Sequence, residues 1–189
     1  MALDVDIATR VLLIGIGATA TMDAWLALMK RLKRPTINFA LVGRWVGHIA
    51  RGRWRHDAIA QSAPVGGERA LGWALHYATG VAFAGVLVAL AGTAWARSPR
   101  LLPALAVGLG TVVLPLFVMQ PAMGAGIASR RTPTPLRNCL RSLTNHAVFG
   151  VGLYLAAAVT AATCPCRARA AARRALPRRS GPPPGGPPP

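Results

Sequence analysis

The chain has 189 residues, of which 53% are hydrophobic and 14% are charged, whereas a soluble domain usually carries about 25% charged residues. Only five residues are acidic against 22 Lys and Arg, which gives a formal net charge of +17. These totals exclude an ordinary soluble domain, and the long uncharged segments favour a single membrane-embedded unit.

Four segments are apolar and long enough to cross about 30 Å of hydrocarbon, which takes about 20 helical residues. They cover roughly residues 9–29, 70–92, 101–121 and 142–163. Helices are required, since lipid leaves no backbone group unpaired and the sequence has no alternating strand pattern. We therefore predict an all-α integral membrane protein, a four-helix bundle within residues 1–163.

The first apolar segment is predicted to be a span rather than a secretory signal. Its leader, MALDVDIATR, contains two acids and one arginine, whereas a signal peptide begins with a positively charged region. The apolar run also continues through AWLALM, beyond any small-residue cleavage site.

The loop after the first span contains a shorter amphipathic segment at about residues 37–50, too short to cross a membrane. If this segment is helical, its apolar residues share one face and its basic residues lie mostly on the other side of the helix. The apolar face comprises Leu41, Val42, Trp45, Val46 and Ile49, and the basic face comprises Arg44, His48, Arg51 and Arg55. Two interpretations stay open: a helix lying under anionic lipid headgroups, or a loop helix packed on the bundle.

Beyond Thr163 the composition changes abruptly. Residues 164–189 are basic and rich in Pro and Gly, and we predict a disordered tail with a polyproline tendency. The cysteines, Cys139, Cys164 and Cys166, have no metal-finger spacing and indicate no disulfide framework.

The basic residues lie mainly in two loops. Thirteen Lys and Arg residues lie in or beside the first and third loops, against three before the first span and in the second loop. The positive-inside rule then places both long loops in the cytoplasm and both termini outside, although six arginines in the tail add charge to the outer side. We expect the bilayer and anionic headgroups as partners and no nucleic acid, because no nucleic-acid module is recognisable.

The strongly polar side chains of the spans share one depth. Asp23 lies about seven residues, or roughly 10 Å, before Lys30, and His76 lies at a similar depth after Arg69. The other three, Gln120, Asn145 and His146, lie near the same membrane face. These five residues form the candidate intramembrane polar site.

Helical spacing places three of these groups on stripes of small residues. Gly15, Thr19 and Asp23 form one stripe; Gly72, His76 and Gly80 form a second; His146, Gly150 and Tyr154 form a third. Small residues let helices approach closely in lipid. An unpaired carboxylate there costs at least about 2.5–3.5 kcal/mol, so we expect Asp23 to face a histidine. The cluster could conduct protons or ions, or it could only clamp the helices together.

A metal site is an alternative interpretation of the same region. Met and His together suit copper(I), and His with a carboxylate suits zinc or iron. The candidate ligands are Met22, His76, Met119, Met123 and His146. Methionine is also an ordinary gap-filling core residue, so no cofactor is predicted and the metal stays unknown. No catalytic motif such as G-x-S-x-G is present, which favours a non-enzymatic role.

Five blocks of the sequence resemble one known family. They are LLIGIGATATMDAW, NFALVGRWVGH, GERALGWALHYATG, MQPAMGAGIASRRTP and TNHAVFGVGLY. Together they resemble the bacterial membrane proteins grouped as domain of unknown function 2938, over about residues 8–160. In the last block Asn145 stands between the Thr and the His associated with the family. The resemblance implies a four-span inner-membrane protein, implies no activity, and carries forward Asp23, His76, Gln120 and His146.

Three function classes follow from these observations. The first is a small proton-coupled transporter, in which Asp23 accepts a proton or cation, the histidines relay it and Gln120 orients them. Four helices are few for a translocation path, so a homodimer is expected. The second is a membrane-embedded metal protein or enzyme acting on a lipid-soluble substrate. The third is a structural or interaction subunit with a polar helix clamp.

Overall fold

The computed structural model describes residues 2–163, with side chains from Val5 onward; the tail at 164–189, predicted to be disordered, lies outside them. Within these residues every regular element is helical. The main helices are α1 (Ala2–Arg31), α2 (Phe39–Ile49), α3 (Glu68–Ala91), α4 (Leu101–Gly110), α5 (Gln120–Ala122) and α6 (Pro135–Thr163). Short turns η1 (Ile59–Gln61), η2 (Pro115–Met119) and η3 (Ile127–Ser129) lie between them.

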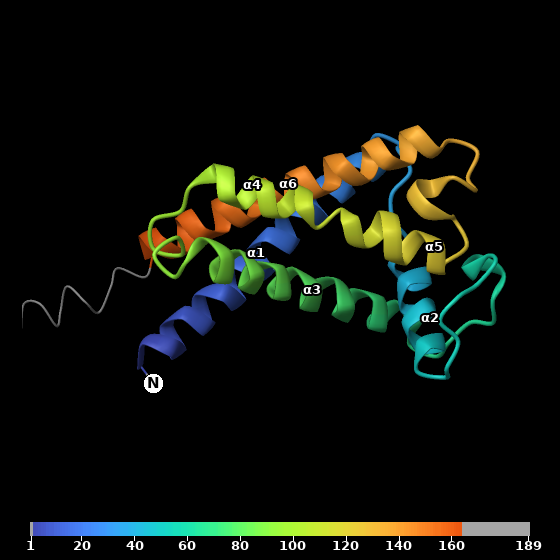
Figure 1. The fold of residues 1–189 in the computed structure, drawn as a ribbon, viewed down its shortest axis with the longest axis horizontal. Coiled ribbons are helices and arrows are strands. Elements are labelled where there is room, and N and C mark those ends of the chain that lie inside the picture. Colours follow the sequence, from blue (N-terminus) through green and yellow to red (C-terminus); the bar gives the residue numbers. More distant parts are fainter. Residues whose placement is uncertain (1, 164–189) are drawn as a thin grey trace, which may run out of the picture.

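Four helical segments are long and apolar enough to cross a membrane: Val5–Arg31, Glu68–Ala91, Leu101–Ala122 and Pro135–Thr163. Three of them run roughly along the long axis of the molecule and α1 crosses them obliquely, with α2 and the long loops at one end (Figure 1). The start of α1 and the end of α6 lie at the opposite end, so the long loops and the described ends of the chain are at opposite ends of the bundle. The fourth segment begins at Pro135 rather than near residue 142.

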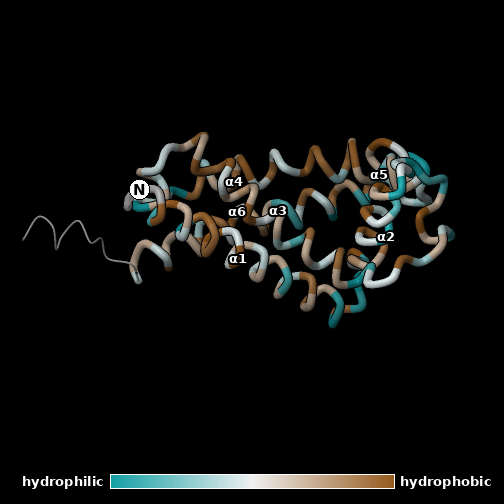
Figure 2. The backbone as a smooth tube through the Cα atoms, turned by 90° about the horizontal axis from the view of Figure 1, so that it is seen from below, coloured by the Kyte–Doolittle hydropathy of each residue, from teal (hydrophilic) through white to brown (hydrophobic). Residues whose placement is uncertain are grey.

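The hydropathy of the chain follows this arrangement. Hydrophilic residues gather at the end that holds α2 and the loops, whereas the middle of the bundle is mainly hydrophobic (Figure 2). The core joins α1, α3 and α6 through buried residues such as Ile14, Leu87 and Leu153, each at most 1% exposed. Many outward-facing side chains are also apolar, such as Leu90 at 75% exposed, which suits helices surrounded by lipid.

Small residues set the closest helix contacts. A Cβ added at Gly15 would meet the backbone of Val81, and one added at Gly80 would meet Thr19, so α1 and α3 touch along the predicted stripes. Gly150 of α6 faces α4 instead, against Leu105 and Gly108. The third stripe therefore packs on α4, whereas Gly15 and Gly80 join α1 to α3.

The third span is not a regular helix. After α4 the chain turns at Thr111 and forms a π-helical segment, Pro115–Met119, in which the amide of Gln120 donates to the carbonyl of Pro115. The sequence predicts a break at Pro121, and the span does end directly after it, at Ala122. A proline ring clashes with the carbonyl four residues earlier, here that of Phe117, and the wider π turn relieves this clash.

Helix α2 packs against the start of α3, which favours the second of the two interpretations left open for this segment. A Cβ at Gly43 would overlap the carbonyl of Glu68, and one at Gly72 would overlap the carbonyl of Phe39. One expectation is wrong: His48, placed on the outward basic face, is only 6% exposed. The loop at residues 53–63 folds back over this face and covers it.

The close contact between α2 and α3 predicts a large effect of one methyl group. Gly43→Ala should destabilise the protein by about 1–3 kcal/mol, because only backbone atoms could move aside. Gly110→Ala is the matched control, since nothing lies within 4 Å of its added Cβ. It should be neutral or stabilise by less than about 1 kcal/mol. Thermal unfolding in detergent compares the two variants, and equal unfolding temperatures would contradict this packing.

Candidate functional site

Asp23 is held by two side chains of α3. His76 Nε2 lies 2.9 Å from Asp23 Oδ1, and the hydroxyl of Tyr77 donates to Asp23 Oδ2 at 2.8 Å. The side chains of His76 and Asp23 are 11% and 20% exposed. Both carboxylate oxygens therefore have a partner, which reduces the cost of placing this charge among apolar helices. Sequence reasoning expected the histidine but missed Tyr77.

The geometry fixes the tautomer of a neutral His76. A carboxylate only accepts hydrogen bonds, so Nε2 carries the hydrogen and donates it to Asp23. The other ring nitrogen, Nδ1, is then a lone-pair acceptor, and no described residue donates a hydrogen bond to it. The ring also stacks against Phe39 of α2, with centroids 4.3 Å apart.

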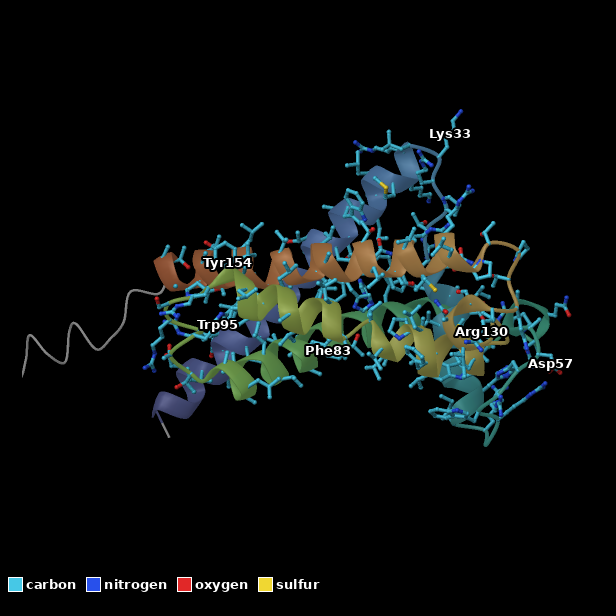
Figure 3. The ribbon with its side chains drawn as sticks, turned by 45° about the horizontal axis from the view of Figure 1, so that its top comes forward. Lys33, Asp57, Phe83, Trp95, Arg130 and Tyr154 are labelled. Atoms are coloured by element: carbon cyan, nitrogen blue, oxygen red, sulfur yellow. The ribbon has the colours of Figure 1, made fainter. Side chains whose placement is uncertain are left out.

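His76 lines a mainly apolar cavity of about 320 Å³. Side chains of α1, α2, α3, α6 and the broken third span surround it, and Phe83, one of them, is labelled within the bundle in Figure 3. Its polar or sulfur-containing lining residues are Thr19, Met22, His76, Thr79, Met119 and His146. The π-helical segment contributes Pro115 and Val118 to the wall opposite α3.

His146 lines the same cavity but does not bind Asp23. Thr111 donates its hydroxyl to the carbonyl of Gly108 at 2.6 Å, so its oxygen is free to accept the hydrogen of His146 Nδ1, at 2.8 Å. His146 Nε2 is then the lone-pair nitrogen. The expected Asp23–His76–His146 cluster therefore forms two separate hydrogen-bonded groups, and both histidines border one cavity.

Two other predicted site residues make their hydrogen bonds elsewhere. Gln120 accepts a hydrogen bond from Ser129 at 2.9 Å, and Asn145 accepts one from the indole of Trp25 at 3.0 Å. Neither lines the cavity. The distance of these residues from the ends of their spans predicts that they lie near one end of the bundle. It does not predict which side of its helix each residue occupies.

The cavity is closed at the loop end by α2, which contributes Phe39, Val42 and Trp45 to the lining. Arg44 holds α2 in place, because its guanidinium binds both carboxylate oxygens of Glu68 at 2.8 Å. The indole of Trp45 donates to the carbonyl of Trp54 at 2.9 Å. These contacts tie α2 to α3 and to the loop that follows it.

A buried histidine pair forms a further contact between α2 and this loop. His48 Nδ1 and His56 Nε2 lie 2.7 Å apart, and His48 Nε2 lies 3.0 Å from the carbonyl of Ala63. With His48 donating to Ala63, His56 must donate to His48, and its own Nδ1 is buried without a hydrogen-bond partner. Burial lowers the pKa of His56, with a smaller contribution from Arg53 and then His48.

Four of the five candidate metal ligands line one cavity. Met22, His76, Met119 and His146 all line the cavity, whereas Met123 does not line it and packs on the buried cluster of Trp45, Ile59 and Ala122. In the part of the chain that the structure describes, no group of three or more His, Cys, Asp or Glu side chains could hold a metal ion. A metal here would therefore need methionine sulfur as well as imidazole.

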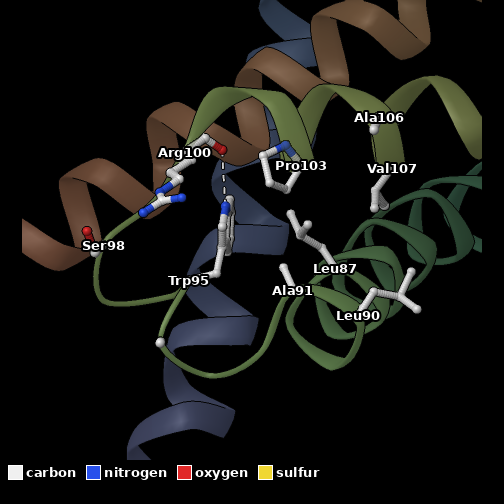
Figure 4. A pocket seen from close by; sticks show the side chains of 10 residues that line it. Leu87, Leu90, Ala91, Trp95, Ser98, Arg100, Pro103, Ala106 and Val107 are labelled. Carbon is white, nitrogen blue, oxygen red and sulfur yellow. Dashed lines mark hydrogen bonds between the residues drawn. The ribbon is translucent and has the colours of Figure 1, made fainter.

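A larger pocket, of about 500 Å³, lies at the other end of the bundle between α3 and α4 (Figure 4). Trp95 borders it, with its indole donating to the carbonyl of Arg100 at 3.0 Å. No carboxylate or imidazole is among its lining residues. It offers no group that could exchange a proton near neutral pH, so the smaller cavity is the candidate site.

The chain belongs to the family described as "Protein of unknown function (DUF2938)", whose family model matches residues 12–160. The resemblance drawn from the five sequence blocks is thus confirmed. The match includes Asp23, His76, Tyr77 and His146. Neither a curated protein nor a solved structure matches the chain.

The hydrogen bond from Tyr77 to Asp23 can be measured by a double-mutant cycle. Tyr77→Phe should cost about 1 kcal/mol of stability in the wild type and almost nothing in Asp23→Leu, which lacks the acceptor. Tyr154→Phe is the control, since no described residue forms a hydrogen bond with its hydroxyl. Equal costs of Tyr77→Phe in both backgrounds would mean that this bond does not contribute.

The histidine pair predicts a pH dependence of stability. His56 has a lower pKa in the folded chain than in the unfolded chain, so the unfolded state binds more protons as the pH falls below about 6.5. The unfolding temperature should therefore be highest above pH 7 and decrease toward pH 5.5. His56→Gln should make the curve flatter over this interval. An unchanged slope in the variant would assign the pH dependence to other groups.

Proposed function

We propose that the protein is a small multi-pass membrane transporter, which exchanges protons for a small apolar molecule carrying a hydrogen-bond donor. One observation carries this proposal: two histidines line one apolar cavity, and each already uses one ring nitrogen on a protein partner. The nitrogen left over on each ring accepts hydrogen bonds. An N–H or O–H group on an otherwise apolar molecule matches this lining best.

Protons and the bound molecule compete for one atom. His76 Nδ1 can take a proton or accept a hydrogen bond from the ligand, but not both. When Nδ1 is protonated, the ring becomes an imidazolium whose charge is offset by Asp23, and the cavity loses the acceptor that this ring provides. Protonation therefore releases the ligand, and deprotonation restores the binding site. This competition is the physical basis of an exchange mechanism.

Helix α2 forms the wall of the cavity at the loop end. Besides its close backbone packing on α3, three side-chain contacts hold it: the Arg44–Glu68 ion pair, the Trp45–Trp54 hydrogen bond and the His48–His56 pair. Protonation of His56 at its unpartnered Nδ1 would bury a positive charge at the last of these contacts and so destabilise the packing of the loop on α2. We therefore assign α2 the role of a gate on the side of the long loops, which we place in the cytoplasm of a bacterial inner membrane. A homodimer stays the expected assembly.

Ligand binding tests the proposed chemistry directly. Indole carries a donor on an apolar ring, whereas naphthalene has a similar shape and no donor. At pH 8 the purified protein should bind indole about tenfold more tightly than naphthalene, the value of one good hydrogen bond. The preference should disappear at pH 5 and in His76→Phe. Equal binding of both probes at pH 8 would contradict a donor site.

Proton coupling is tested in proteoliposomes with an entrapped pH-sensitive dye. An inward gradient of indole should drive proton efflux faster than in empty vesicles, and Asp23→Asn should reduce this rate at least about tenfold, because the imidazolium loses its counter-charge. Asp57→Asn, which removes an exposed carboxylate outside the cavity, should leave the rate unchanged. If Asp23→Asn showed proton efflux at the wild-type rate, the carboxylate of Asp23 would have no role in proton coupling.

A second candidate function is copper(I) binding, favoured by the presence of two methionines and two histidines around one cavity. A carboxylate that fixes one nitrogen of a histidine often leaves the other to a metal. Copper(I) should then raise the unfolding temperature of the wild type more than that of Met119→Leu. If copper(I) does not shift the unfolding temperature and the protein binds indole, the copper-binding proposal is excluded and only the transporter proposal stands.

A further inference from the structure

A separate pocket of about 480 Å³ lies between the end of α1 and the start of α6. It shares no lining residue with the histidine cavity. Trp25 and Asn145 connect its two sides through the hydrogen bond from the indole to Asn145 Oδ1, at 3.0 Å. The pocket therefore belongs to the fixed contact between two spans rather than to a loop alone.

The lining of this pocket has two chemically different parts. One part is apolar and comes mostly from α1: Trp25, Leu26, Met29 and Leu32. The other part is basic and consists of Arg34, Arg137 and Arg141. No acidic residue lines the pocket. Among the described residues, none of the three guanidinium groups forms an ion pair or a side-chain hydrogen bond.

The pocket lies at the loop end of two candidate spans. The candidate span of α1 ends at Arg31, with Arg34 just beyond it, and the candidate span Pro135–Thr163 has Arg137 and Arg141 near its start. Lys33, next to the pocket in the sequence, is on a flank of the molecule well apart from Asp57 and Arg130 (Figure 3). No residue of α2 or of the loop at residues 53–63 lines the pocket.

We propose that this pocket binds an anionic phospholipid of the surrounding bilayer. The phosphate would lie among Arg34, Arg137 and Arg141, since guanidinium groups bind phosphate oxygens in pairs of hydrogen bonds. An acyl chain would lie along Leu26 and Met29, where the wall continues toward the hydrocarbon. Basic pockets between spanning helices are a recurring form of headgroup site. This lipid site is independent of the proton-coupled cavity.

Lipid binding to the full chain in neutral detergent tests the proposal. Native mass spectrometry should detect phosphatidylglycerol bound in preference to phosphatidylcholine. Each of Arg34→Gln, Arg137→Gln and Arg141→Gln should weaken binding of phosphatidylglycerol about fivefold. The triple variant should lose the preference for the anionic lipid. The triple replacement of Arg51, Arg53 and Arg55 by Gln removes the same charge from the segment that follows α2, outside the pocket, and should retain the preference.

Two results would overturn the proposal. Equal loss in both triple variants would mean that only the total charge of the protein attracts the lipid. Full displacement of phosphatidylglycerol by millimolar glycerol phosphate would mean that the arginines hold a soluble phosphate and that the apolar wall has no role. Replacing the three pocket arginines with Lys provides a second check, because charge is kept and paired hydrogen bonding is lost. This variant should bind more weakly than the wild type and more tightly than the Gln variant.

Discussion

The carboxylate of Asp23 is the constraint on which the site depends. It lies inside an apolar helix, where a lone charge would be costly, and the contact between α1 and α3 provides partners for both of its oxygens. That contact requires Gly15 and Gly80, because larger side chains would separate the helices. The hydrogen bond between His76 Nε2 and Asp23 Oδ1 also orients the imidazole ring. The contact between α1 and α3 therefore decides both how the charge of Asp23 is compensated and how the ring of His76 is oriented.

The walls of the cavity follow from two irregular features. The π-helical segment ahead of Pro121 widens the third span where it faces α3, and π-helical turns are common at functional sites. Helix α2 closes the loop end, where its Gly43 packs against Gly72 of α3 and the Arg44–Glu68 ion pair lies beside this contact. A cavity with one distorted wall and one separately anchored wall is suited to opening without disruption of the core formed by α1, α3 and α6.

The sequence predicts the parts of this structure that depend on local hydrophobicity and on the spacing of residues along a helix. Long apolar runs locate the four segments, and the spacing of Gly15, Thr19 and Asp23 identifies the face of α1 that meets His76. A stripe shows which face is buried, but it does not identify the neighbour, so the contact of His146 with Thr111 was not predicted. Tyr77 follows His76 directly, and only the three-dimensional packing shows that both reach one carboxylate. His48 is buried because a distant loop covers it, which no local period reveals.

The tautomer of His76 is the most direct measurement of the central claim. Solid-state ¹⁵N nuclear magnetic resonance on histidine-labelled protein in bilayers separates the two ring nitrogens, and His76→Gln identifies their signals among the four histidines. We predict that at pH 8 Nε2 carries the hydrogen and Nδ1 has a lone pair, and that acidification adds a proton to Nδ1. A ring with hydrogen on Nδ1 at pH 8 would contradict the account, because that nitrogen could accept neither a proton nor a ligand.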